Sequence, residues 1–325
     1  MPHLPLSALE VAVVQRDFPP SASLRNCEAA AREFDRLGYH RLWFAEHHHS
    51  PAIGVFPPPI MTAHIAAATS HLRVGSGGVL APNHAPLTVA EQFTTLAALH
   101  EGRIDLGIGR GPGTFHEGTA RALRRGADPA TDEEYRRDVA AILDHLRECS
   151  LGQLPEPWLL ASSEAGAAVA ALLGLPIAVA HHIRPQNTVR VLGRYREEFR
   201  PSAWREDPYA LLCVETVCAD TEERAAELKR PMDIIKSRLL AGQAEEPFVS
   251  PAAAADHRFT AEESEQLAAF GAHQAYGTPE SVASRLTQLA DATAADELML
   301  VTPVYDVADR VRSFELVAKA LAAGS

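Results

Sequence analysis

RVGSGGVLAPNHAP, residues 73–86, is an apolar, strand-like run that ends in small and polar residues, and three other stretches share this form. They are RLWFAEHHHSP (41–51), RIDLGIGRGPGT (103–114) and PWLLASSEAG (157–166). Buried strands that deliver their polar residues at the carboxyl ends build the site of a (β/α)8 barrel. The sequence therefore predicts an α/β TIM barrel with its functional residues on that face.

Apolar runs bounded by turn residues predict eight strands, the number in a TIM barrel. They cover residues 10–14, 41–45, 72–79, 104–109, 158–161, 176–180, 210–217 and 297–301. Helical-period stretches alternate with them at 24–37, 59–68, 87–99, 133–147, 165–173, 189–198, 221–240 and 262–289. The main rival, a doubly wound open sheet, needs a glycine-rich loop after its first strand, where residues 11–23 contain no glycine.

The chain of 325 residues has the length of one barrel, so we expect a single domain over residues 1–325. The alanine- and proline-rich stretch 241–260 follows the seventh strand and predicts a long mobile loop or lid. Such loops are usually functional or disordered.

Composition excludes several classes of protein. Acidic residues outnumber basic ones by 42 to 30, which argues against a nucleic-acid binder. The chain shows neither a secretory signal nor eighteen uncharged apolar residues in a row, so we expect no membrane span and a cytoplasmic location. Its four cysteines form no C-x-x-C pair, which disfavours a zinc ribbon or a disulfide framework.

The triple histidine His47, His48 and His49 follows the second predicted strand. Consecutive side chains on extended backbone point to opposite faces, so we expect no metal site there. An inward His47 could act as a base, a proton donor or a hydrogen-bond partner of a bound ring. The competing interpretation is a solvated strand end.

Small residues interrupt the third predicted strand at Gly75, Ser76, Gly77 and Gly78. Such an interruption usually marks a bulge or the close approach of another molecule. A flat ring lying against the strand would explain it, and a bulge required only for barrel closure is the alternative.

Two strand ends carry groups suited to an anion. The run after the fourth strand is no dinucleotide fingerprint, because Pro112 stands where the third glycine belongs, but it presents Arg110 as a fixed cation. Arg110 could also pair with a loop acid. Ser162 and Ser163 open a helix after the fifth strand, and together with Arg110 they predict a phosphate site.

The chain resembles the bacterial luciferase-like flavin monooxygenases, which are TIM barrels. The similarity is carried by AEHH (45–48), residues 73–93, GRIDLGIGRGPGT (102–114), WLLASS (158–163) and AALLGLPIAVAHH (170–182). PYALL, ADTEERA and YGTPESV extend it over nearly the whole chain.

The resemblance implies a role for each matching residue. His47 matches the active-site histidine beside the reacting edge of the flavin, and Gly77 and Gly78 match a pair joined by a non-proline cis peptide under the ring. The family's phosphate-binding residues are matched by Arg110, Arg121, Ser162 and Ser163.

The chain departs from the family pattern in its phosphate loop. Ala161 replaces a glycine, and residues 165–167 supply no side-chain donor. One phosphate contact is then missing, and we expect weak binding of oxidised flavin.

The resemblance implies a monooxygenase that uses reduced FMN, dioxygen and a small organic substrate. Because the chain lacks a nicotinamide fingerprint, a separate flavin reductase would supply the electrons, and relatives imply a homodimer. An F420-dependent hydride-transfer enzyme and a non-catalytic flavin-binding barrel are the alternatives. The arginine- and alanine-rich composition is typical of a GC-rich genome, which adds secondary metabolism to the expectations. The roles of His48, His49, His181 and His182 stay open.

Overall fold

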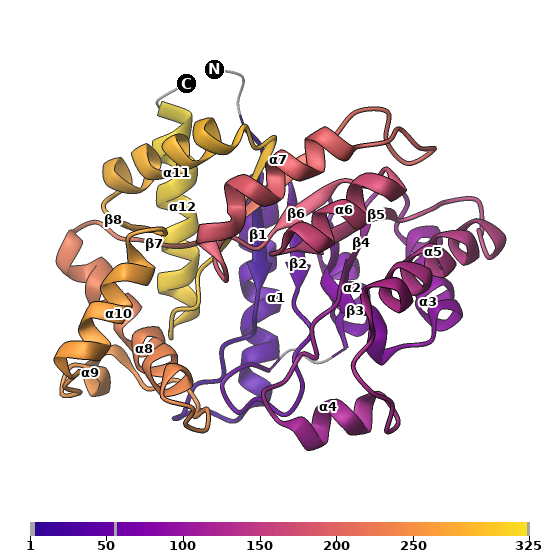
Figure 1. The fold of residues 1–325 in the computed structure, drawn as a ribbon. Helices are drawn as coiled ribbons and strands as arrows, with labels where there is room; N and C mark the ends of the chain where they lie inside the picture. Colours follow the sequence, from indigo (N-terminus) through magenta and orange to yellow (C-terminus); the bar gives the residue numbers. More distant parts are fainter. Residues whose placement is uncertain (1–3, 55–56, 324–325) are drawn as a thin grey trace.

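The structure, a computed structural model, describes residues 4–54 and 57–323. Within these residues eight parallel strands close into a barrel, each hydrogen-bonded to its neighbours on both sides (Figure 1). Around the barrel they are β1 (Leu6–Glu10), β2 (Arg41–Phe44), β3 (Arg73–Leu80), β4 (Ile104–Gly109), β5 (Glu156–Ala161), β6 (Ile177–Val179), β7 (Ala210–Cys218) and β9 (Glu297–Val301). The predicted TIM barrel is confirmed.

Helices surround the barrel (Figure 1). They are α1 (Ser21–Arg36), α2 (Pro58–Ala68), α3 (Pro86–Leu99), α4 (Glu117–Leu123), α5 (Asp132–Glu148), α6 (Glu164–Leu173), α7 (Thr188–Glu198), α8 (Glu222–Leu240), α9 (Pro251–Ala254), α10 (Ala261–Gly271), α11 (Pro279–Thr293) and α12 (Val307–Ala323). The chain termini lie at the opposite end of the barrel from α4 and α9 (Figure 1). None of the helices in the described ranges is long and apolar enough to cross a membrane.

The first strand lies four residues earlier than its predicted place at 10–14. The carboxylate of Glu10 accepts the backbone N–H of Ala12 at 2.7 Å, and Ala12 has a φ of 48°. This left-handed residue turns the chain out of the sheet. The apolar run beyond it is buried without belonging to a long strand, because Val13 forms only an isolated bridge with Ile53.

Buried charges close the amino-terminal end of the barrel. Arg41 on β2 pairs with Glu297 on β9 through Nε and Oε1 at 2.8 Å, and with Asp105 on β4 through Nη1 and Oδ2 at 2.9 Å. Its guanidinium also lies 4.6 Å from the ring centroid of Trp158. Since paired charges and aromatic rings fill this end of the barrel, an open site is left to the carboxyl end.

Strands β3 and β4 approach each other unusually closely. A Cβ atom added at Gly75 would lie 2.3 Å from the carbonyl oxygen of Asp105, and one at Gly78 would lie 2.7 Å from that of Gly107. The pairing register shifts between Gly77 and Val79, which is the bulge considered from the sequence. Strand packing therefore accounts for two of these glycines without any ligand.

The segment 241–260 is less loop-like than predicted. Phe248 is buried, its N–H donates to the carbonyl of Val14, and its own carbonyl accepts the N–H of Arg16, both at 2.8 Å. The segment also contains the short helix α9, and the structure adds β8 (Ala275–Gly277) beside the outer part of β7. The mobility of this segment stays a prediction.

Candidate active site

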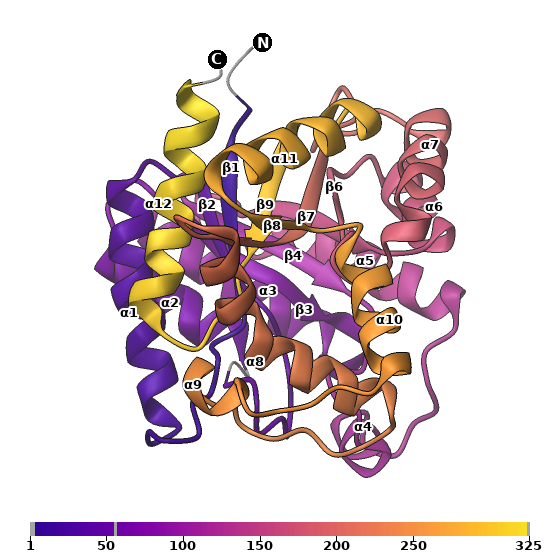
Figure 2. The same cartoon turned by 90° about the vertical axis from the view of Figure 1, so that its left-hand side faces the viewer.

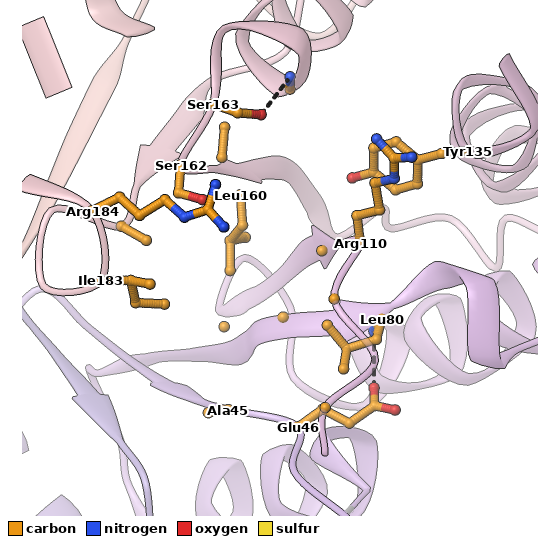
Figure 3. A pocket seen from close by; sticks show the side chains of 18 of the residues that line it. Ala45, Glu46, Leu80, Arg110, Tyr135, Leu160, Ser162, Ser163, Ile183 and Arg184 are labelled. Atoms are coloured by element: carbon orange, nitrogen blue, oxygen red, sulfur yellow. Dashed lines mark hydrogen bonds between the residues drawn. The ribbon is translucent and has the colours of Figure 1, made fainter. Parts of the chain in front are cut away.

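A cavity of about 550 Å³ opens at the carboxyl ends of β2 to β6 (Figure 3). We call it the mouth cavity. The structure gathers there most of the site residues predicted from the sequence: His47, Gly77, Gly78, Arg110, Ser162 and Ser163. Arg121 is the exception, because it lies exposed on α4 and does not line the cavity. The separate strand ends thus form one site.

His47 follows β2 and is largely enclosed. Its Nδ1 atom is buried and has no hydrogen-bond partner within the described chain. Burial lowers the pKa of His47 to about 4, with a further lowering from His48, while the charge of Glu46 opposes the shift. His47 is therefore a neutral imidazole at pH 7, with a free ring nitrogen beside the cavity.

The other two histidines of the triplet have structural partners. Nε2 of His48 lies 2.8 Å from Oε1 of Glu46, and Nε2 of His84 lies at the same distance from that oxygen. His49 instead faces outward, with Nδ1 2.8 Å from the hydroxyl of Thr119. Each of the three rings thus has a different environment.

The wall of the mouth cavity carries no side chain at Gly77 and Gly78 of β3, although Leu80 at the end of this strand does line the cavity. The peptide between Gly77 and Gly78 is cis, as the family resemblance implied. Both glycines line the cavity, and a Cβ at Gly77 would lie 2.7 Å from Cδ1 of Leu9 on β1. Bare backbone is therefore exposed to whatever occupies the cavity.

Arg110, directly after β4, is already paired. Its guanidinium forms an ion pair with Asp132 and donates to the carbonyl of Ala130 at 2.9 Å. It also lies 5.8 Å from the ring centroid of Tyr135. Asp132 is thus the acid with which the sequence suggested that Arg110 could pair. Arg110 nevertheless borders the cavity (Figure 3).

Ser162 and Ser163 lie at the start of α6, on the β5 side of the cavity. The hydroxyl of Ser163 caps the helix by accepting the N–H of Gly166 at 3.4 Å, and the carbonyl of Ser162 accepts from the side chain of Asn187 at 3.0 Å. A Cβ at Gly166 would lie 3.0 Å from the Cβ of Ala161, so a side chain at this position would be in tight contact with Ala161.

Arg184 is the cation that sequence reasoning missed. It follows β6 by only a few residues, and its side chain extends toward Ser162 (Figure 3). Within the described residues its guanidinium forms no hydrogen bond or ion pair, unlike that of Arg110. The signal available in the sequence was a basic residue close behind a strand end, the same signal that pointed to Arg110.

A second cavity of about 820 Å³ adjoins the first, and we call it the apolar chamber. The two cavities share His47 and Gly77 among their lining residues. Apolar side chains from β1, β2, β9 and α8 form most of its walls, among them Leu9, Trp43, Met232, Ile235 and Met299. A molecule in the chamber therefore lies next to the mouth cavity.

The two histidines after β6 differ in their surroundings. His181 is fully bonded, with Nδ1 2.8 Å from the hydroxyl of Thr188 and Nε2 2.8 Å from the carbonyl of His273. His182 lines the apolar chamber, and its Nδ1 lies 3.4 Å from the carbonyl of Cys213. Burial lowers the pKa of His182 to about 4, so this ring is neutral as well.

Residues 10–296 match the family model of the luciferase-like monooxygenases. The chain belongs to the luciferase-like monooxygenase family. A relative named luciferase-like monooxygenase from Escherichia coli strain K12 is 35% identical over 325 residues, covering 95% of each protein. YvbT of Bacillus subtilis strain 168 is 37% identical over 327 residues, covering 96% of this chain and 95% of YvbT.

Solved structures agree with this family assignment. The crystal structure of apo-MsnO8 is 37% identical, with a TM-score of 0.91 and coverage of 98% of this chain and 99% of MsnO8. Two more distant structures share the fold alone. A type II Baeyer–Villiger monooxygenase in complex with FMN has 17% identity, a TM-score of 0.71 and coverage of 99% and 98%. An F420-dependent secondary alcohol dehydrogenase has 14% identity, a TM-score of 0.68 and coverage of 98% and 99%.

Proposed function

We propose that this luciferase-like monooxygenase uses dioxygen and reduced FMN, supplied by a separate flavin reductase, to oxygenate a small organic substrate. The observation that carries the proposal is the content of the mouth cavity. A neutral His47 with an unpartnered Nδ1 shares that cavity with a cluster of guanidinium and hydroxyl groups. Such a donor set is suited to a phosphate-bearing cofactor.

The residues present fit the two parts of FMN. A phosphate accepts hydrogen bonds, and Ser162, Ser163 and Arg184 would hold it with Arg110 at the border of the cavity. The bare backbone of Gly77 and Gly78 leaves space for a flat ring. Because Arg184 provides a cation without a partner among the described residues, and this chain lacks the hydroxyl of the family pattern, we infer that Arg184 replaces the missing contact.

The reduced flavin supplies the electrons with which dioxygen is activated. The protein binds and orients the reactants, and the cavity walls exclude water. Neutral His47 can accept a proton at one ring nitrogen while it donates from the other. Its place between the mouth cavity and the apolar chamber suits it to hold or move a proton where cofactor and substrate meet.

Anaerobic titration with FMN and with reduced FMN tests the cofactor, and oxygen uptake with a flavin reductase tests the reaction. We expect reduced FMN to bind more tightly than oxidised FMN, and oxygen uptake to accompany product formation. His47→Ala should reduce product formation and leave FMN binding unchanged. Binding and turnover of reduced F420 without oxygen would favour the hydride-transfer alternative, whereas cofactor binding without any reaction would favour a non-catalytic barrel.

We further infer a homodimer formed through α2 and α3, in the cytoplasm and in a secondary-metabolic role. Three large apolar side chains on these helices are exposed: Ile60 by 66%, Leu87 by 44% and Leu99 by 69%. Exposed apolar side chains on two neighbouring helices support a protein interface there. The compartment and the metabolic role rest on composition alone.

A further inference from the structure

We propose that the apolar chamber selects an uncharged, mainly apolar substrate that carries a single hydroxyl or carbonyl oxygen, and that Lys236 and His182 bind this oxygen. The proposal rests on the proposed function and specifies the class of substrate that would be oxygenated. Three features of the described chamber carry it: its apolar walls, its internally neutralised lysine and the free nitrogen of His182.

The walls favour an apolar molecule of considerable size. Cavities of about 300–1,000 Å³ suit drug-sized ligands, and the chamber has about 820 Å³. Trp43 and Leu9 line it from the barrel, while Met232, Ile235 and Leu239 line it from α8. Both α8 and α10 contribute residues to the walls, and in Figure 2 these two helices lie in the foreground, on the side that faces the viewer. Burial of apolar substrate surface against these side chains favours binding.

The lysine in the chamber is compensated. Lys236 on α8 forms an ion pair with Glu215 on β7 at 2.5 Å, and their side chains are only 13% and 4% exposed. Oε1 of Glu215 also accepts the hydroxyl of Tyr276 at 2.8 Å. The ammonium lies 4.1 Å from the ring centroid of Phe270. Lys236 is thus held in one place, with its charge balanced by Glu215.

This charge balance disfavours an anionic substrate. Among the described residues that line the chamber, the charged side chains are Lys236, Glu215 and Glu245. One cation and two carboxylates leave no net positive charge to offset the desolvation of a carboxylate, sulfonate or phosphate group. The ammonium of Lys236 has three N–H donors, so it can still donate to a neutral oxygen.

His182 provides a complementary acceptor. The carbonyl of Cys213 can only accept, so the contact at 3.4 Å places the proton on Nδ1 of His182. Nε2 of this neutral ring is then an acceptor, and it has no partner among the described residues. A hydroxyl could donate to His182 and accept from Lys236, whereas a carbonyl would use Lys236 alone.

Calorimetric titration of the whole protein with matched naphthalenes tests the selectivity without flavin or oxygen. The probes are 2-naphthol, 2-acetonaphthone and 2-naphthoate, at pH 7.5. We expect the naphthol and the ketone to bind at least about tenfold more tightly than the carboxylate, since the carboxylate would be desolvated without a net counter-charge.

Two substitutions test the mechanism. Glu215→Gln removes the carboxylate that is paired with Lys236 and one of the two negative charges of the chamber, so naphthoate should bind about tenfold more tightly while naphthol changes little. Lys236→Met should weaken naphthol about tenfold. Lys236→Met leaves the carboxylate of Glu215 without its partner, which could unfold the protein. In that case the double variant Glu215→Gln/Lys236→Met removes both charges of the pair and should show the same loss of naphthol binding, about tenfold. Lys229→Met is the matched control, because Lys229 lies on the same helix, pairs with Asp233 and does not line the chamber.

The proposal is overturned if naphthoate binds the unmodified protein as tightly as naphthol, if none of the probes binds, or if Glu215→Gln and Lys229→Met change the preference equally. Failure of the proposed function looks different. If the protein binds naphthol selectively but neither binds nor uses reduced FMN, the selectivity proposed for the chamber stands and the proposed monooxygenase reaction is wrong.

Discussion

Leu80 donates its backbone N–H to Oε2 of Glu46 at 2.9 Å, and this bond joins the end of β3 to the end of β2. Oε1 of the same carboxylate accepts from His48 and His84. Burial opposes ionisation of Glu46, but the hydrogen bonds from both histidines and from Leu80 outweigh it and lower its pKa. A single buried carboxylate thus fixes the backbone on either side of His47.

Glu46→Gln should lower the free energy of unfolding by about 1–3 kcal/mol, because the amide cannot accept at both positions. Urea denaturation at pH 7 measures the change. Glu33→Gln removes only an exposed ion pair with Arg36 and should have almost no effect. The pKa of Glu46 is lowered in the folded state, so its stabilising effect is present at neutral pH and is lost as pH falls through that pKa. An equal acid sensitivity of both variants would contradict this.

Replacing His47 by glutamine should reduce the acid sensitivity of folding. The pKa of His47 is about 4 in the folded protein and about 6.5 when unfolded, so unfolding takes up a proton between these values. The stability that His47 contributes is therefore complete above pH 6.5 and declines as pH falls toward 4. Denaturation at pH 5 and pH 7 should show a smaller difference for His47→Gln than for the unmodified protein. If both proteins lose the same free energy of unfolding between pH 7 and pH 5, His47 is already protonated in the folded state at pH 5.

Gly78→Ala should destabilise the barrel by about 1–3 kcal/mol, because its new methyl group would meet the carbonyl oxygen of Gly107 in a packed strand pair. Gly118→Ala, on α4, meets no atom within 4 Å and should be neutral or slightly stabilising. Thermal unfolding of the two variants side by side makes the comparison. Equal melting temperatures would mean that β3 and β4 can move apart at low cost.

Arg184→Met should weaken binding of FMN about tenfold or more, since a charged hydrogen bond to the phosphate is lost. Binding of riboflavin, which lacks the phosphate, should not change. Arg121→Met is the control, because Arg121 is exposed and lies outside the mouth cavity. Fluorescence titration with both flavins measures the effect. If Arg121→Met weakens FMN and Arg184→Met does not, the family's implied assignment of Arg121 is correct and ours is wrong.

Leu99→Glu should dissociate the inferred homodimer, because it places a charge on an exposed apolar surface of α3. Leu151→Glu provides a control of similar exposure, since Leu151 is 64% exposed and lies outside α2 and α3. Sedimentation velocity should give a dimer for the control and a monomer for Leu99→Glu. A monomeric unmodified protein would refute the inference directly.

Local sequence patterns were sufficient for the barrel and for most of the site. The carboxyl ends of all barrel strands lie on one face. The polar residues of a run such as 103–114 could therefore be assigned to that face without knowing which strands lie beside it. Contacts between residues far apart in the sequence could not be predicted from these local patterns. The shift of β1 depends on a left-handed Ala12, and the pairing of Arg110 with Asp132 depends on how a loop returns. The predicted helical stretches end at residue 289, whereas the structure adds the closing helix α12 after β9.

The glycine-rich third strand shows the limit most clearly. From the sequence, its glycines indicated either a bound ring or a bulge. In the structure Gly75 serves close strand packing, Gly78 both packs closely against β4 and lines the mouth cavity, and Gly77 faces both cavities. A one-dimensional pattern cannot separate these roles, because both require the absence of a side chain.

Strand β8 pairs only with the outer part of β7, beyond the segment of β7 that closes the barrel. Helices α8 and α10 both precede this strand in the chain and supply one part of the wall of the apolar chamber, whereas the mouth cavity is formed at the ends of β2 to β6. Insertions, deletions and exchanges in residues 222–277 can therefore diversify substrate preference during evolution while the catalytic face is inherited unchanged.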